Sequence, residues 1–74
     1  MADDGQGFNQ MRMREARNAL GWNTTKLANE VGVTELTIRK WEAGLSTPGF
    51  IHGMRLARAL QLDPFELVVL SPAA

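Results

Sequence analysis

The segment TTKLANEVGVTELTIRKWEA, residues 24–43, constrains the fold of this 74-residue chain more than any other stretch. Helix-forming residues run up to Gly32, and a second helical run begins after Thr34. Gly32 stands where the chain must leave the first helix, a place that favours positive φ. Apolar residues recur at helical spacing on both sides of it: Leu27, Ala28 and Val31 before, Ile38 and Trp41 after. Because both stripes must reach one core, the segment predicts two short helices joined by a turn of about three residues and crossing at a steep angle.

The same start signal precedes three of the predicted helices. A capping residue, Asn23, Thr34 or Asp63, lies between two apolar residues that are spaced as the halves of a hydrophobic staple. These apolar pairs are Trp22 and Leu27, Val33 and Ile38, and Leu62 and Leu67. After Asp63, Pro64 occupies the first helical position and Glu66 the third, which completes a capping box. This is the best-signalled helix start in the chain.

Glycine and proline positions divide the chain into five candidate helices, and no segment is typical of a strand. Besides the pair in residues 24–43, helices are expected over residues 9–20, over residues 47–60 and after Asp63. Gly49 and Gly53 each weaken the start of the fourth helix by about 1 kcal/mol relative to alanine, so residues 54–60 are its better supported part. The predicted fold class is all-α, a compact domain of five short helices around one core.

A chain of this length supports one domain with a single modest core. We expect the domain to cover residues 8–70, with a flexible leader at residues 1–7 and a flexible tail at residues 71–74. No apolar run approaches the length of a membrane span, and the N-terminus MADDGQG lacks the regions of a secretion signal. We therefore expect a cytoplasmic protein that does not bind a membrane, and the absence of cysteine fits that reducing compartment.

The reactive and charged residues argue against several classes of function. The sequence has no glycine-rich phosphate loop, no cysteine nucleophile and a single histidine, His52, without partner ligands. We therefore expect no catalysis, no metal and no cofactor. Eight basic residues balance eight acidic ones, which argues against a protein that binds any polyanion indiscriminately. A local basic face is still open, because Lys26, Arg39 and Lys40 cluster in the middle of the chain.

The residues of the two-helix unit resemble a known family. Ala28, Gly32, the apolar positions around them and the following Trp41-Glu42-Ala43-Gly44 are similar to the phage-repressor and Cro-type (XRE) helix-turn-helix family. The resemblance extends over about residues 13–67. It implies a lambda-repressor-like DNA-binding domain of five helices, in which the second helix of the unit enters the major groove and the start of the first abuts a phosphate.

The resemblance assigns candidate DNA contacts by position. Candidate base contacts are Thr34, Glu35, Leu36, Thr37 and Lys40, and Arg39 lies among them on the same helix. Candidate phosphate contacts are Thr24 and Lys26, with Leu45, Ser46 and Thr47 of the following loop nearby. A helix N-terminus attracts phosphate, whereas a cation in its first turn, such as Lys26, opposes the helix dipole unless an anion lies beside it. The resemblance also implies that Arg17 and Glu42 form an ion pair inside the scaffold.

Two residues of the predicted DNA-binding face are also open to a structural interpretation. Glu35 is repelled by phosphates unless it accepts a hydrogen bond from a cytosine amino group; otherwise it supports its helix by pairing with Arg39. Leu36 can contact a thymine methyl group or be a solitary surface leucine. Trp22 and Trp41 occupy staple and stripe positions, so we expect them in the core rather than stacked on bases.

The predicted function is sequence-specific binding of double-stranded DNA by a small transcriptional regulator, a repressor that acts as a homodimer on a two-fold operator. One recognition helix reads only a few base pairs, so useful specificity requires two half-sites about 34 Å apart. The predicted fifth helix is more apolar than one core-facing stripe requires, and it is the candidate dimer surface. Its apolar residues are Phe65, Leu67, Val68, Val69 and Leu70. The alternative is an antitoxin-type interaction module that binds a toxin-like partner protein and regulates itself through the same two helices.

Overall fold

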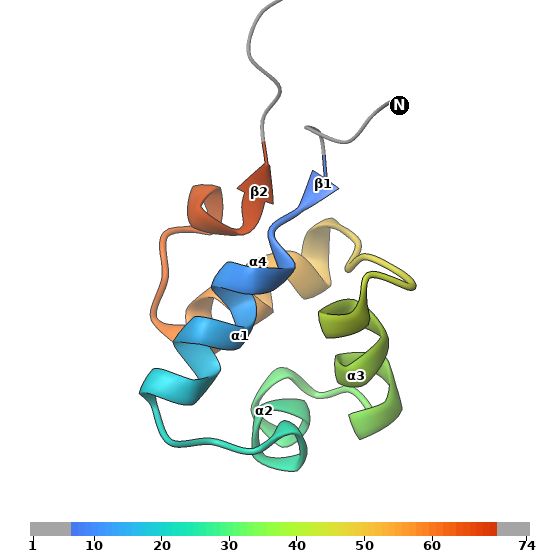
Figure 1. Ribbon diagram of the computed structural model, residues 1–74, viewed down its shortest axis with the longest axis vertical. Coiled ribbons are helices and arrows are strands. Elements are labelled where there is room, and N and C mark those ends of the chain that lie inside the picture. The colour runs from blue at the N-terminus through green and yellow to red at the C-terminus, as the bar shows by residue number, and fades with distance from the viewer. Residues whose placement is uncertain (1–6, 70–74) are drawn as a thin grey trace, which may run out of the picture.

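The computed structural model describes residues 7–69, and Figure 1 shows their helices gathered around a shared centre with the two strands side by side. The α-helices are α1 (Gln10–Ala19), α2 (Thr24–Val31), α3 (Glu35–Ala43) and α4 (Phe50–Leu60). A short 3-10 helix, η1 (Pro64–Leu67), follows, and strand β1 (Gly7–Phe8) pairs antiparallel with strand β2 (Val68–Val69). Over these residues, no helix has the length and apolar character needed to cross a bilayer.

The helix-start signals form as predicted at α2 and α3. Asn23 Oδ1 accepts the amide of Lys26 at 2.7 Å, and Thr34 Oγ1 accepts the amide of Thr37 at 3.2 Å. Each bond satisfies one of the amides that a helix leaves free in its first turn. Gly32 closes α2 with a φ of 89°, a left-handed conformation that costs other L-residues about 1–2 kcal/mol. The predicted two-helix unit therefore starts and turns where the sequence indicates.

The core is built from the predicted apolar stripes. Every stripe residue of α2 and α3 is buried, together with residues of α1, α4 and η1. The buried apolar set is Met13, Ala16, Leu27, Ala28, Val31, Ile38, Trp41, Leu56, Ala57, Leu60 and Leu67. Trp22, Val33 and Leu62 are partly buried against this cluster, as expected of staple residues. The two tryptophans thus belong to the core and its margin, as predicted.

An ion pair links the first and third helices beneath the surface. Arg17 Nε donates to Glu42 Oε2 at 2.7 Å, and Arg17 Nη2 donates to Glu42 Oε1 at 3.0 Å. Arg17 Nη1 also donates to the carbonyl of Trp22 at 2.9 Å. The side chains of Arg17 and Glu42 are only 13% and 7% exposed, so this bidentate pair is largely shielded from water. The ion pair implied by the family resemblance is confirmed.

The prediction of a fifth α-helix is wrong. Its start signal forms: Asp63 Oδ1 accepts the amide of Phe65 at 2.9 Å, and the amide of Asp63 donates to Glu66 Oε2 at 3.2 Å. The helix nevertheless ends after one 3-10 turn, and Val68 is extended with φ −109° and ψ 130°. Two consecutive valines favour strand, and a strand needs a partner, which the distant Gly7–Phe8 segment supplies. The described chain therefore has four α-helices, and the all-α class holds apart from this two-stranded ribbon.

Two predicted boundaries also move. The fourth helix begins at Phe50 rather than at residues 47–48, because Gly49 is extended, with φ −71° and ψ 179°, and is the N-cap of the helix. Its residues 54–60 are helical as predicted. Gly7, which the sequence assigns to the leader, lies in β1 opposite Val69. The rest of the predicted leader and the tail at residues 71–74 lie outside the described residues.

Candidate nucleic-acid interface

The outward side of α3 is the first part of the candidate interface. α3 turns Ile38, Trp41 and Glu42 into the protein. None of these three belongs to the predicted base-reading set, of which Leu36 is 60% exposed and the Arg39 side chain 66% exposed. Thr34 and Lys40 are exposed as well, while Glu35 and Thr37 are half-buried. The side of α3 that carries the candidate base contacts is therefore open to a ligand and is not covered by other described parts of the chain.

Two threonine hydroxyls are paired at the entrance to α3. Thr34 Oγ1 and Thr37 Oγ1 lie 2.9 Å apart, and Thr34 Oγ1 also accepts the amide of Thr37. A hydroxyl has one donor and two acceptor positions, so this pairing does not exhaust either group. Both threonines keep hydrogen-bonding capacity at the N-terminal end of α3, the end that the family resemblance predicts to enter the major groove.

A polar cluster formed by Thr24, Glu35 and Arg39 connects the starts of α2 and α3. Thr24 Oγ1 donates to Glu35 Oε2 at 2.6 Å, across eleven positions of sequence. Arg39 Nε and Nη2 donate to the same oxygen at 3.3 and 3.1 Å, which confirms the predicted pairing of Glu35 with Arg39. The hydroxyl of Thr24, and after it the guanidinium of Arg39, holds the pKa of Glu35 below its ordinary value of 4.5. The carboxyl group is therefore ionised at neutral pH.

The N-terminus of α2 is the second part of the candidate interface. Asn23 takes the amide of Lys26, which leaves the amides of Thr24 and Thr25 without an acceptor in the described hydrogen-bond network. Free amides and the helix dipole favour an anion at this place. Lys26 does not depend on such an anion, because its ammonium group lies 2.9 Å from Glu30 Oε2 and 5.5 Å from the ring centre of Trp22. The sequence predicts an anion beside Lys26 to offset the unfavourable helix dipole, and Glu30 of α2 supplies one.

The loop after α3 is the third part. Gly44 ends the helix with a φ of 79°, and the chain then crosses the surface with Leu45 76% exposed. Ser46 and Thr47 are both exposed, and neither hydroxyl has a hydrogen-bond partner among residues 7–69. The loop therefore offers two unoccupied hydroxyls near the C-terminal end of α3.

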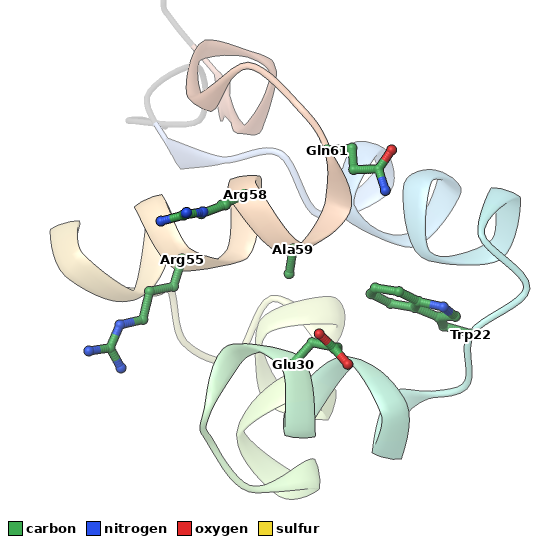
Figure 2. A pocket seen from close by; sticks show the side chains of 6 residues that line it. All are labelled: Trp22, Glu30, Arg55, Arg58, Ala59 and Gln61. Carbon is green, nitrogen blue, oxygen red and sulfur yellow. The ribbon is translucent and has the colours of Figure 1, made fainter.

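A shallow hollow between α2 and α4 was not predicted from the sequence. It has a volume of about 400 Å³ and is lined by Trp22, Glu30, Arg55, Arg58, Ala59 and Gln61 (Figure 2). Figure 2 shows that the side chain of Arg55 extends away from Trp22 and Ala59. The side chains that line the hollow therefore do not point toward one common ligand position. No residue of α3 lines it, and the described residues contain no group of three histidine, cysteine or acidic side chains that could hold a metal ion.

The predicted dimer surface is only partly available. Phe65 is 76% exposed and Val68 44% exposed, as a docking surface requires. Leu67 is 3% exposed and belongs to the core instead, because the 3-10 turn directs it against α1 and α4. Val69 lies in β2, where its side chain is not described, and Leu70 lies outside the described residues.

Comparison with known proteins agrees with this geometry. The model of the helix-turn-helix family matches residues 13–67. An uncharacterized HTH-type transcriptional regulator of Methanothermobacter thermautotrophicus is 43% identical over 54 residues, which make up 73% of this chain and 78% of that protein. The solved structures of similar fold include two proteins at 29–30% identity.

The first of these is the P22 c2 repressor in complex with the synthetic operator 9T, with a TM-score of 0.76, 29% identity, and coverage of 84% of this chain and 91% of that one. The second is the restriction-modification controller protein C.AhdI from Aeromonas hydrophila, with a TM-score of 0.73, 30% identity, and coverage of 77% and 86%. The family match spans most of the chain and contains the whole of α2 and α3. The chain therefore belongs to the helix-turn-helix family, and the predicted resemblance to phage repressors is confirmed.

Proposed function

We propose that this protein binds double-stranded DNA at a specific sequence and acts as a transcriptional repressor in the form of a homodimer. The observation that carries the proposal is the exposed polar side of α3 beside the free amides at the start of α2. That arrangement offers side chains for base edges and an electropositive helix end for a phosphate within one surface. The similarity to the P22 c2 repressor, which was solved with an operator, supports the same assignment.

Base readout is assigned to α3. Lying in the major groove, the helix brings the hydroxyls of Thr34 and Thr37 to base edges at its N-terminal end. Lys40 donates to a guanine or to a nearby phosphate from the outer side of the helix. Leu36, exposed and apolar, contacts a thymine methyl group. These contacts specify the sequence because each base pair presents its own pattern of donors, acceptors and methyl groups in the major groove.

Backbone contacts position the helix. The free amides of Thr24 and Thr25 receive one phosphate, and the hydroxyls of Ser46 and Thr47 approach another on the far side of α3. Lys26 adds positive charge beside the first phosphate, although it shares that charge with Glu30. With a net charge of zero, the protein is expected to have modest nonspecific affinity and a shallow dependence of binding on salt.

A homodimer supplies the second half-site. The exposed part of the proposed dimer surface consists of Phe65 in η1 and Val68 in β2 of the β1–β2 ribbon. Two copies related by a two-fold axis place their α3 helices about 34 Å apart, one turn of the duplex. Pairing of identical surfaces is the commonest way in which small soluble proteins form symmetric oligomers.

Selection of binding sites from a pool of random duplexes tests the proposal. The expected product is a pair of inverted half-sites whose centres lie about 34 Å apart. Size-exclusion chromatography of the same sample is expected to show a dimer. Failure to enrich any sequence at low ionic strength would contradict the proposed function.

A second candidate, an interaction module for another protein of the toxin-like kind, is favoured by one observation. Leu45, Phe50, Ile51 and Met54 are exposed around the loop after α3 and the first turns of α4. Exposed apolar residues that gather in one region often mark a binding surface. A chain that is monomeric by size-exclusion and enriches no duplex favours this candidate over the repressor.

A further inference from the structure

Glu35 places a negative charge on a surface where binding of DNA would make that charge unfavourable. It is the first residue of α3, and its side chain is 39% exposed on the surface that is proposed to meet DNA. A negative charge there is repelled by phosphates unless it gains a specific partner in the complex. Its contacts within the protein show which partner it can accept.

All of the described intramolecular bonds to Glu35 converge on one oxygen. Thr24 Oγ1 donates to Oε2 at 2.6 Å, and Arg39 Nε and Nη2 donate to the same atom. Oε1 receives none of these three bonds, and the hydroxyl of Thr25, which also lowers the pKa of Glu35, makes no hydrogen bond to it of ordinary length. The carboxylate is thus held from two helices by one oxygen, while the other is left as an acceptor. A side chain held in this way loses little conformational freedom when a ligand binds.

The chemistry of the free oxygen restricts its target. The lowered pKa of Glu35 keeps the group ionised, so Oε1 accepts and cannot donate. In the major groove only the amino groups of cytosine and adenine donate. Adenine presents its N7 acceptor beside that amino group, and two acceptors facing each other repel. Cytosine presents no acceptor of its own there, which favours it as the partner of Oε1.

Arg39 can donate to the other base of the same pair. Its Nε and Nη2 are bonded to Glu35, and Nη1 has no bond in the described part of the chain. The guanine paired with cytosine presents O6 and N7, two acceptors that suit a guanidinium. The pair Glu35 and Arg39 therefore offers an acceptor and a donor side by side, which matches the two edges of one C·G pair.

We propose that Glu35, positioned by Thr24 and Arg39, is a specificity-determining residue that accepts a hydrogen bond from the amino group of a cytosine, with Arg39 donating to the guanine of that pair. This inference rests on the proposed DNA-binding function and adds to it the base pair that each half-site must contain. The bonds that Thr24 and Arg39 donate to Oε2 are positioning contacts. They orient the carboxylate, and the base bonds to the other oxygen, Oε1.

The test compares sites selected from random duplexes by the wild-type protein and by Glu35→Gln. The glutamine keeps one carbonyl oxygen that can accept from Thr24 and Arg39. Its amide NH2 group, a donor, replaces the acceptor Oε1. The wild type is expected to enrich a C·G pair at one fixed position of each half-site. Glu35→Gln is expected to lose that preference in favour of a base that presents an acceptor, with at least about a fivefold change in the ratio of affinities for the two sites.

Two further variants separate readout from charge and from folding. Glu15→Gln removes the same charge from an exposed carboxylate on α1, and its selected site is expected to be unchanged. Thr24→Val removes the hydroxyl that holds Oε2, and it is expected to weaken the preference for C·G while the other positions of the half-site stay the same. Thermal melting of each variant checks that the fold is kept.

The outcomes distinguish this inference from the function on which it rests. If the wild type selects a two-fold site but Glu35→Gln and Glu35→Ala select the same site with unchanged affinity ratios, the role of Glu35 is overturned and DNA binding stands. If the sites that the wild type selects share no C·G pair at a fixed position of the half-site, the base assignment is likewise overturned. If the wild type selects no site, the proposed function fails and the inference fails with it.

Discussion

At the scale of single residues, the exposed face of α3 contains both side chains that already have partners and side chains that have none. Glu35 and Arg39 are bonded to each other, and Thr34 and Thr37 share a hydrogen bond. Lys40 is exposed and makes no ion pair among residues 7–69. Its role is therefore the simplest to isolate, because its removal breaks no described contact inside the protein.

Replacement of Lys40 by alanine is expected to weaken binding to the selected operator by about 1–3 kcal/mol, because one donor to a base edge is lost. The melting temperature is expected to stay nearly unchanged, since the side chain is exposed and unpaired within the described residues. Fluorescence anisotropy with labelled duplex measures the first quantity and circular dichroism the second. Unaltered operator binding removes Lys40 from the interface.

Glu35 leads to a prediction about pH. Its pKa is lowered in the folded protein by the hydroxyl of Thr24 and by Arg39, so its ionised form is favoured by folding. That stabilisation is present above the ordinary carboxyl pKa of 4.5 and is lost as the pH falls through the lower, folded value. The difference in melting temperature between the wild type and Glu35→Gln is therefore expected to shrink as the pH is lowered below 4.5. A difference that is constant or grows in acid contradicts the described bonds.

At the scale of elements, the α2–α3 unit depends on local signals that repeat along the chain. Asn23 and Thr34 cap their helices with their own side chains, and Gly32 ends α2 with a left-handed residue. The start of η1 shows that such signals determine where a helix begins and not how long it lasts. Asp63 and Glu66 form the predicted capping box, yet the chain leaves the helix after Leu67.

Gly32→Ala is expected to destabilise the protein by about 1–2 kcal/mol, because alanine must adopt the left-handed conformation. Space is not the limitation, since the nearest atom to an added Cβ is Arg55 Nη1 at 3.8 Å. Gly53→Ala is the matched control: Gly53 lies within α4, outside the left-handed region and with open space around an added Cβ, so no loss is expected. Equal melting temperatures for the two variants contradict this account of the turn.

At the scale of the whole molecule, the apolar residues form one core, and most of the large apolar residues that are exposed lie in two regions. One region, Phe65 and Val68, lies at the proposed dimer surface, and the other surrounds the start of α4. The first is continuous with the β1–β2 ribbon, in which the two ends of the described chain meet (Figure 1). The proposed dimer surface and the proposed DNA-binding side of α3 thus lie on different elements, so each can be changed separately.

Phe65→Ser is expected to convert the dimer to a monomer at micromolar concentration and to reduce affinity for a two-half-site operator at least about tenfold, because the second recognition helix is lost. Phe50→Ser is the matched control, since Phe50 is 79% exposed against 76% for Phe65. Sedimentation equilibrium and titration of one-site and two-site duplexes measure both effects. A monomer produced by Phe50→Ser alone moves the dimer surface to the start of α4.

The sequence by itself determined the features that depend on neighbours within about one or two helical turns. The caps at Asn23 and Thr34, the left-handed turn at Gly32 and the buried stripes follow from spacing that any local segment carries, so they could be predicted. The pairing of Arg17 with Glu42 was accessible only through the family resemblance, because twenty-five positions separate them.

The tertiary structure decided what depends on residues brought together from distant parts of the chain. The predicted fifth helix ends after one 3-10 turn, and Val68–Val69 form a strand instead because Gly7–Phe8 lies beside them, a contact that no local pattern indicates. Thr24 reaches Glu35 because the starts of α2 and α3 lie close together, and that contact holds one oxygen of the Glu35 carboxylate. A hydrogen bond between two helices requires both to be placed within a fraction of an ångström, and only the packed core sets that distance.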